Sequence, residues 1–116
     1  MMKKPYTPRD RPHHHLGMNG LERDYAQHLE TLRLTRKIRG WHWQSVKFRL
    51  ADKTWYHPDF MVIADDGTLE IHETKGFMRE DANVKLKVTS ALYWEYTVKL
   101  VQRAGRDGFA IREIIA

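Results

Sequence analysis

The first regular pattern along the chain is helical. Apolar and aromatic side chains recur every three or four residues, at Leu21, Tyr25, Leu29 and Leu32. Asn19 is a good N-cap, and Glu22 stands three residues later, at the capping-box position from which its carboxylate reaches back to the cap's backbone N–H. Glycine favours the end of a helix, so we predict one helix that begins at Asn19 and ends near Arg39-Gly40.

After this helix the apolar period changes to two residues, which is typical of strands. Residues 46–50 alternate between apolar and basic side chains and predict a half-exposed strand. Residues 55–63 predict a second, more buried strand, and residues 69–75 a third. Because Asp-Gly between two apolar runs is a strong hairpin signal, Asp65-Asp66-Gly67 is predicted to turn the second strand into the third.

Helical spacing returns once Gly76 has interrupted the third strand. Residues 80–96 predict a second amphipathic helix, and residues 97–102 and 109–114 predict two further strands. The expected order is therefore helix, three strands, helix, strand, strand. A strand, a covering helix and another strand resemble a parallel crossover, so we predict an α/β (α+β) fold with a mixed sheet flanked by both helices.

Length and composition indicate one domain. A chain of 116 residues can bury one core but is too short for two. Residues 1–18 are rich in Lys, Arg and Pro and carry little apolar periodicity, so we expect a flexible basic arm there, followed by the domain over residues 19–116. The absence of cysteine excludes disulfides and thiolate zinc sites.

Charge favours a polyanionic partner. The formal net charge is +5, and each Lys or Arg placed on a phosphate releases condensed counterions. No apolar run approaches the ~20 residues that cross a bilayer. No apolar stretch of the secretory-signal type follows the first basic residues. We therefore expect a cytoplasmic protein that acts on nucleic acid and does not bind membranes.

Two segments carry the candidate chemistry, Tyr56-His57-Pro58-Asp59-Phe60 and Glu70-Ile71-His72-Glu73-Thr74-Lys75-Gly76. Strand side chains alternate between faces, so Glu73 and Lys75 are expected to point the same way and to meet Asp59 across the hairpin. Two carboxylates at ~4 Å repel by about 4 kcal/mol at an effective dielectric of about 20. A divalent cation relieves this repulsion, and oxygen ligands suit Mg²⁺ or Mn²⁺. This pattern favours phosphodiester hydrolysis.

Each half of the pattern also has an ordinary structural explanation. An Asp after a Pro is commonly a turn residue. Glu-x-Lys on a strand is commonly an exposed ion pair, which contributes ~0.2 to 1 kcal/mol. Their combination on neighbouring strands, with Asp59 on one and Glu73 and Lys75 on the other, is what favours a catalytic centre.

The same residues resemble a known signature. Pro58-Asp59 followed by Glu73-Thr74-Lys75 is similar to the PD-(D/E)XK motif of restriction enzymes, Holliday-junction resolvases and phage endonucleases. A wider pattern resembles a small phage and prophage family of endonuclease-like proteins, DUF1064. The likeness runs from about residue 19 to residue 96 and is carried by Asn19-x-x-Glu22-x-x-Tyr25, Gln44-x-x-x-Phe48, Tyr56-x-Pro58-Asp59-Phe60, Asp66-Gly67, Glu73-x-Lys75-Gly76 and Lys85-x-Lys87.

This resemblance implies a restriction-endonuclease-like core and a Mg²⁺-dependent endodeoxyribonuclease. Asp59 and Glu73 would bind the metal ion, with Lys75 beside the nucleophile. Glu22 would complete the metal shell, with helix capping as the alternative role. Thr74, where family members commonly have Val, would contribute only its backbone carbonyl, its side chain facing away. Ser45 stands where the family often has Pro, which affects only local strand geometry.

The likeness to resolvases further implies a homodimer that acts on branched or junction-containing DNA, in the host cytoplasm if the protein is phage-encoded. Lys85 and Lys87 lie about 200° apart around a helix, so they cannot both face one phosphate. A non-catalytic DNA-binding or packaging accessory protein with the nuclease fold is the alternative, and a ribonuclease is a third possibility. The candidate phosphate-binding residues are Lys85, Lys87, Arg79, Lys47 and Arg49.

Overall fold

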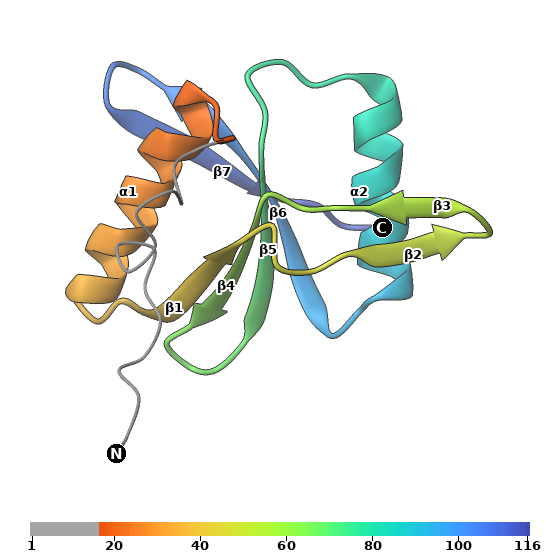
Figure 1. Ribbon diagram of the computed structural model, residues 1–116, viewed down its shortest axis with the longest axis horizontal. Coiled ribbons are helices and arrows are strands. Elements are labelled where there is room, and N and C mark those ends of the chain that lie inside the picture. The colour runs from red at the N-terminus through yellow and green to blue at the C-terminus, as the bar shows by residue number, and fades with distance from the viewer. Residues whose placement is uncertain (1–16) are drawn as a thin grey trace.

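The computed structural model describes residues 17–116. A five-stranded sheet in the order β1-β4-β5-β6-β7 lies between the two helices, and a separate two-stranded ribbon, β2–β3, extends to one side (Figure 1). The helices are α1 (Gly20–Leu34) and α2 (Glu80–Leu92). The strands are β1 (Ile38–Trp43), β2 (Phe48–Ala51), β3 (Thr54–Tyr56), β4 (Phe60–Ala64), β5 (Leu69–Thr74), β6 (Tyr96–Ala104) and β7 (Gly108–Glu113).

The predicted fold class is confirmed, because the sheet is mixed and a helix packs on each face. β5 and β6 are parallel and are joined by α2, whereas β4 pairs antiparallel with β5 and β7 pairs antiparallel with β6. The predicted hairpin turn is also present. Gly67 has a φ of 88°, which favours glycine, and Asp66 Oδ1 accepts a hydrogen bond of 2.9 Å from the Thr68 amide.

The first helix is shorter than predicted, and the strand that follows it was missed. α1 ends at Leu34, after which Arg36 adopts a φ of 61° and the chain turns. Residues 38–43 then form β1, which pairs with β4 and includes Gly40. The prediction was wrong because Gly40 was interpreted as a helix end, although it lies inside an edge strand.

The strand predicted over residues 55–63 is two strands that belong to different sheets. β3 ends at Tyr56 and pairs with β2, and β4 begins at Phe60 and pairs with β1 and β5. Pro58, which is fully buried, lies between them, and its missing N–H cannot take part in a strand ladder. Residues 57–59 therefore belong to neither strand.

Two apolar clusters hold the layers together. The cluster under α1 includes Tyr25, Leu29, Phe60 and Val101, and the cluster under α2 includes Ile71, Leu86 and Leu100. Since residues 100 and 101 of β6 belong to opposite clusters, each helix covers one face of the sheet. Burying one such side chain contributes about 1.5 to 3 kcal/mol.

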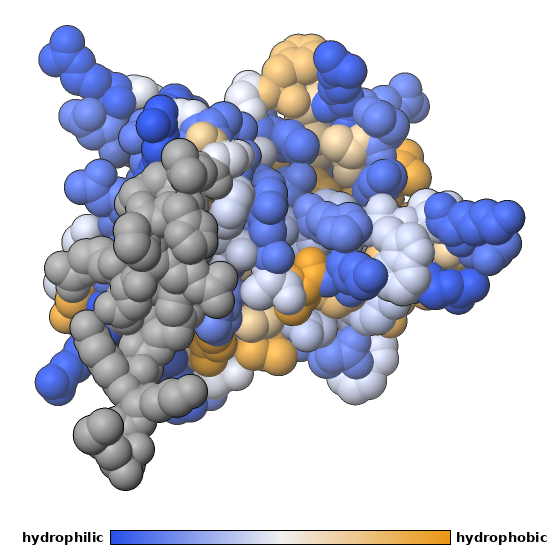
Figure 2. All heavy atoms as spheres, in the orientation of Figure 1, coloured by the Kyte–Doolittle hydropathy of each residue, from blue (hydrophilic) through white to orange (hydrophobic). Residues whose placement is uncertain are grey.

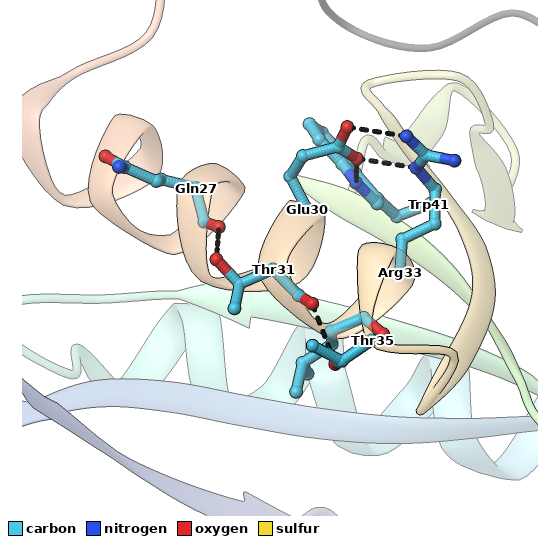
Figure 3. Close-up of polar contacts among 7 residues, drawn as sticks. Gln27, Glu30, Thr31, Arg33, Thr35 and Trp41 are labelled. Carbon is cyan, nitrogen blue, oxygen red and sulfur yellow. Dashed lines mark hydrogen bonds and ion pairs between the residues drawn. The ribbon is translucent and has the colours of Figure 1, made fainter.

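Polar contacts tie the second half of α1 to β1 (Figure 3). Glu30 Oε1 accepts hydrogen bonds from Arg33 Nε at 2.7 Å and from the indole N–H of Trp41 at 3.2 Å. The hydroxyls of Thr31 and Thr35 each donate to the backbone carbonyl four residues earlier. These contacts fix the orientation of α1, whose first turn carries Glu22.

The predicted basic arm, residues 1–18, lies outside the described residues except for Gly17 and Met18. Met18 is buried in the cluster under α1, so the folded domain includes this residue as well. Neither helix within residues 17–116 is long and apolar enough to cross a membrane. Hydrophilic residues make up most of the coloured surface in Figure 2.

Candidate functional site

The candidate site lies where the Tyr56–Phe60 segment meets the end of β5. Phe60 is opposite His72 in the register of β4 and β5, so Asp59, one residue before β4, lies beside Glu73. The carbonyl of Asp59 accepts a hydrogen bond from the Gln44 amide at 2.8 Å, which anchors the same segment to the chain after β1. Pairing of β4 with β5 and the contact with the chain after β1 therefore position Asp59.

Glu73 is the most constrained acid of the site. Its side chain is buried, and Oε1 accepts hydrogen bonds from the Tyr56 hydroxyl at 2.8 Å and from the Asp59 amide at 3.1 Å. Burial, followed by repulsion from Asp59, raises the pKa of Glu73 to about 7. The hydrogen bond from Tyr56 and the charge of Lys75 act in the opposite direction and lower this pKa.

Lys75 lies beside Glu73, as expected from the alternation of strand side chains. Its Nζ is 3.3 Å from Oε2 of Glu73, the carboxylate oxygen that the other two donors leave to it. The lysine side chain is 36% exposed and that of Glu73 only 7%, so the ammonium reaches the solvent edge of an otherwise buried pair. A substrate that approaches the site from solvent would meet Lys75.

Asp59 makes contacts that the sequence did not predict. Its Oδ2 accepts hydrogen bonds from the backbone N–H of Thr74 at 2.9 Å and from the Thr74 hydroxyl at 2.8 Å. The expectation that the Thr74 side chain faces away was therefore wrong. Asp59 lies before β4 starts, so the alternation of strand side chains does not restrict its carboxylate to one face of the sheet. The carboxylate can therefore reach Thr74 at the end of β5.

Glu22 joins the site from α1. It is buried, and its Oε2 accepts a hydrogen bond of 2.9 Å from the indole N–H of Trp43. Burial raises the pKa of Glu22, and repulsion from Asp59 raises it further, whereas attraction to Lys75 lowers it. The two charges that act on Glu22 are thus those of the hairpin site, and the three groups share one electrostatic environment.

Glu22 also takes part in capping α1, the alternative considered from sequence. Asn19 Oδ1 accepts a hydrogen bond from the Glu22 amide at 2.8 Å, and a hydrogen bond with the Asn19 backbone lowers the pKa of the Glu22 carboxyl. Capping and proximity to Asp59 are therefore compatible, because the first turn of α1 itself borders the site.

Sequence reasoning gave no role to Tyr56 or Trp43. Tyr56 was part of the motif around Pro58 and Asp59 but had no assigned partner, and it is a direct donor to Glu73. Trp43 had no assigned partner either, and its indole N–H donates to Glu22. A polar aromatic residue two or three positions before a candidate acid is the signal that could have identified Tyr56.

The donor set suits a hard cation in its chemistry. Asp59, Glu73 and Glu22 offer only carboxylate oxygens, which Mg²⁺ and Mn²⁺ prefer. Burial, together with repulsion from Asp59, raises the pKa values of Glu73 and Glu22 despite the nearby charge of Lys75, and a divalent ion would offset both effects. Within residues 17–116, no three His, Cys, Asp or Glu side chains are already grouped as a metal site.

The candidate phosphate-binding residues divide into two groups. Arg79 and Lys87 line an open cavity at the start of α2, whereas Lys85 is exposed on the same helix and does not line it. The other two lie by the ribbon β2–β3. Lys47 Nζ is 4.9 Å from the ring centre of Trp55, and Arg49 is 4.0 Å from Asp52.

Comparison with known proteins assigns no family to this chain. No protein-family model matches it, and searches of curated proteins and of solved structures found no match. The likeness to PD-(D/E)XK nucleases therefore rests on the residue pattern given above. Function is accordingly proposed from that pattern together with the geometry of Asp59, Glu73, Lys75 and Glu22.

Proposed function

We propose that this protein is a metal-dependent endonuclease that hydrolyses phosphodiester bonds in DNA. One observation carries the proposal. The Asp59 amide and the Lys75 ammonium both contact the buried carboxylate of Glu73, at 3.1 Å and 3.3 Å, so the three residues that carry the resemblance to the PD-(D/E)XK motif lie together. The raised pKa of Glu73 supports a role beyond that of an exposed ion pair.

Asp59 and Glu73 would hold Mg²⁺ or Mn²⁺, with Glu22 completing the shell and the Thr74 carbonyl as a further ligand. The bound ion would polarise the phosphate and lower the pKa of a water molecule. The protein holds these acids in position before any substrate arrives. Tyr56 fixes Oε1 of Glu73, Thr74 fixes Oδ2 of Asp59 and Trp43 fixes Oε2 of Glu22.

Lys75 would supply positive charge at the reacting phosphate. Its ammonium is paired with Glu73 and its side chain is partly exposed, so it can orient an attacking water molecule or offset the charge that gathers on the phosphate oxygens. The formal net charge of +5 supports binding to a polyanion. Together these features favour hydrolysis of a phosphodiester.

We further propose that branched or junction-containing DNA is the substrate and that the protein acts as a homodimer. Symmetric cutting of two strands needs two sites, and residues 17–116 hold one cluster of this composition. Recognition of DNA shape is favoured because backbone contacts from Lys and Arg carry no sequence information. A phage-type protein of this kind would act in the host cytoplasm.

The test compares cleavage of branched duplex, linear duplex and RNA, each with Mg²⁺ and with EDTA. Wild-type protein is expected to cut branched DNA only with the metal. Asp59→Asn and Lys75→Ala are expected to lose cutting by at least about 100-fold, the usual scale for removal of a charge-stabilising group. Asp52→Asn, in the exposed turn of the β2–β3 ribbon, removes the same charge outside the site and is expected to cut normally.

A non-catalytic DNA-binding accessory protein is the second candidate. The hydrogen bonds from Thr74 to Asp59 and the Lys75–Glu73 ion pair favour it, because they already satisfy part of the cluster without a metal. Under this alternative, DNA is retained in a gel shift but remains uncut with Mg²⁺ or Mn²⁺. Cutting of RNA in preference to DNA would instead identify a ribonuclease.

A further inference from the structure

A cavity of about 400 Å³ opens between the start of α2 and β7. Its lining includes one cation from the residue that caps α2, one from the body of α2 and one from β7, namely Arg79, Lys87 and Arg112. Glu80 is the acid among the lining residues, so the lining has a formal charge of +2 at neutral pH. Asn83 adds an amide that can donate hydrogen bonds to an anion.

Glu80 offsets only part of the charge that these three cations bring to the lining. Among the ion pairs formed within residues 17–116, none involves Arg79, Lys87 or Arg112. Like charges that share a hollow repel one another, and an anionic ligand relieves this repulsion. Arginine presents a planar fork of donors that matches a phosphate group, and lysine adds a point charge. The lining therefore suits a phosphate.

The sheet register relates this cavity to the carboxylate site. Glu73 on β5 is opposite Leu100 on β6, and Leu100 is opposite Arg112 on β7. Residues directly opposite one another share a face of the sheet, and Leu100 belongs to the cluster under α2. Arg112 therefore lies on the α2 face, two strands from Glu73. With strands spaced about 4.8 Å apart, the two residues are about 10 Å apart.

We infer that this cavity binds a backbone phosphate of the DNA strand next to the phosphate that is cut, with Arg112 as its principal ligand and Lys87 and Arg79 beside it. This inference rests on the proposed nuclease function for its ligand. DNA is favoured over a free anion for two reasons. The cavity is open to solvent, and its Arg112 lies on the same face of the sheet as Glu73, so one strand of DNA could contact both. It would fix the register of the strand without reading its sequence.

The test measures DNA binding by fluorescence anisotropy across a series of salt concentrations, with Ca²⁺ in place of Mg²⁺. The double variant Arg112→Ala/Lys87→Ala is expected to bind about 10-fold more weakly, and its plot of log affinity against log salt to be shallower by about one unit. The matched control is Arg106→Ala/Lys37→Ala. It removes the same two charge types from exposed positions outside the cavity and is expected to change affinity less than twofold.

Equal losses in the two double variants would overturn the inference, since general charge attraction would then explain binding. Inorganic phosphate is tested as a competitor. If it saturates the wild-type protein at the concentrations at which it displaces DNA, the choice of DNA is overturned in favour of a free anion. Tighter binding of RNA with the same dependence on Arg112 would overturn the choice of DNA in favour of RNA. Melting temperatures within about 2 °C of wild type would show that the variants are folded.

The binding assay is also run in EDTA with Asp59→Asn, so that it does not depend on cleavage. Loss of DNA binding in the cavity variants with no cutting in any metal would reject the proposed nuclease and retain the phosphate site. Cutting by the wild type with no difference between the cavity variant and its control would retain the nuclease and reject the phosphate site.

Discussion

The hydroxyl of Tyr56 donates a hydrogen bond of 2.8 Å to Oε1 of Glu73, and both side chains are buried. Tyr56 ends β3, in the ribbon beside the main sheet, whereas Glu73 lies on a central strand. This contact therefore joins the two sheets at the candidate catalytic acid. It also lowers the pKa of Glu73 against the larger effect of burial.

Tyr56→Phe removes this donor and keeps the ring. We expect a loss of about 1 to 2 kcal/mol in the free energy of unfolding at pH 8, because a buried carboxylate loses a hydrogen bond. The measurement is urea unfolding. Tyr93→Phe is the control, since the Tyr93 hydroxyl donates to the Arg49 carbonyl at an exposed position. Equal losses in the two variants would contradict the special role of the Glu73 contact.

The pKa of Glu73 predicts how stability depends on pH in the absence of divalent ions. The folded protein holds the Glu73 proton up to about pH 7, whereas an unfolded chain releases it near 4.3. This linked stability is fully present below the unfolded pKa and is lost as pH rises through the folded pKa. We expect the wild type to lose about 3 kcal/mol between pH 4 and 8 from this group.

Glu73→Gln isolates the effect, because the amide stays neutral at every pH. Urea unfolding in EDTA is expected to show that this variant loses less stability than the wild type between pH 4 and 8, and that it is the more stable of the two at pH 8. Glu95→Gln, at an exposed position after α2, is expected to keep the wild-type dependence. An unchanged pH profile in Glu73→Gln would show that other groups control it.

Divalent metal is expected to stabilise the folded protein at pH 8. At a tenfold excess over the dissociation constant, mass action contributes about 1.4 kcal/mol, or about 5 °C in melting temperature for a domain of this size. Mg²⁺ and Mn²⁺ should both act, and Asp59→Asn should abolish the shift. Asp52→Asn, with the same change of charge on an exposed turn, should keep it. A shift that survives in Asp59→Asn would place the ion elsewhere.

Thr74→Val tests the contact that the sequence did not predict. The substitution keeps the side-chain shape and removes the hydroxyl that donates to Asp59 Oδ2, while the Thr74 amide continues to donate. We expect a loss of about 1 kcal/mol in unfolding free energy, and Thr74→Ser is expected to retain the hydrogen bond. Cleavage should fall less than in Asp59→Asn. A full loss of cutting would assign the Thr74 hydroxyl a larger role.

Periodicity predicted the parts of the fold whose patterns are local. The β4–β5 hairpin carries its own turn signal at Asp66-Gly67, and α2 and β6 follow with distinct periods. β1 was missed because it is an edge strand whose partner, β4, lies some twenty residues further along the chain. Pairing with a distant segment overrides the local preference of residues such as Gly40, and no window of sequence contains that information.

The candidate site shows the same division. The pairing of Glu73 with Lys75 follows from strand alternation and was predicted. The contacts of Asp59 with Thr74 and of Glu22 with Trp43 depend on how a turn and a helix approach the sheet, which periodicity does not specify. Arg112 was missed for a similar reason, because only the register of β6 with β7 brings it into line with Glu73.

The register of β5, β6 and β7 places Glu73, Leu100 and Arg112 in one row and so fixes the distance between the acid and the arginine. Backbone hydrogen bonds join the three strands along their paired length, so the distance between the acid and the arginine cannot increase without breaking several of them. Insertions in the turn between β6 and β7 would leave that interval unchanged. A DNA strand with one phosphate bound at Arg112 would then always place the same phosphodiester bond at Glu73.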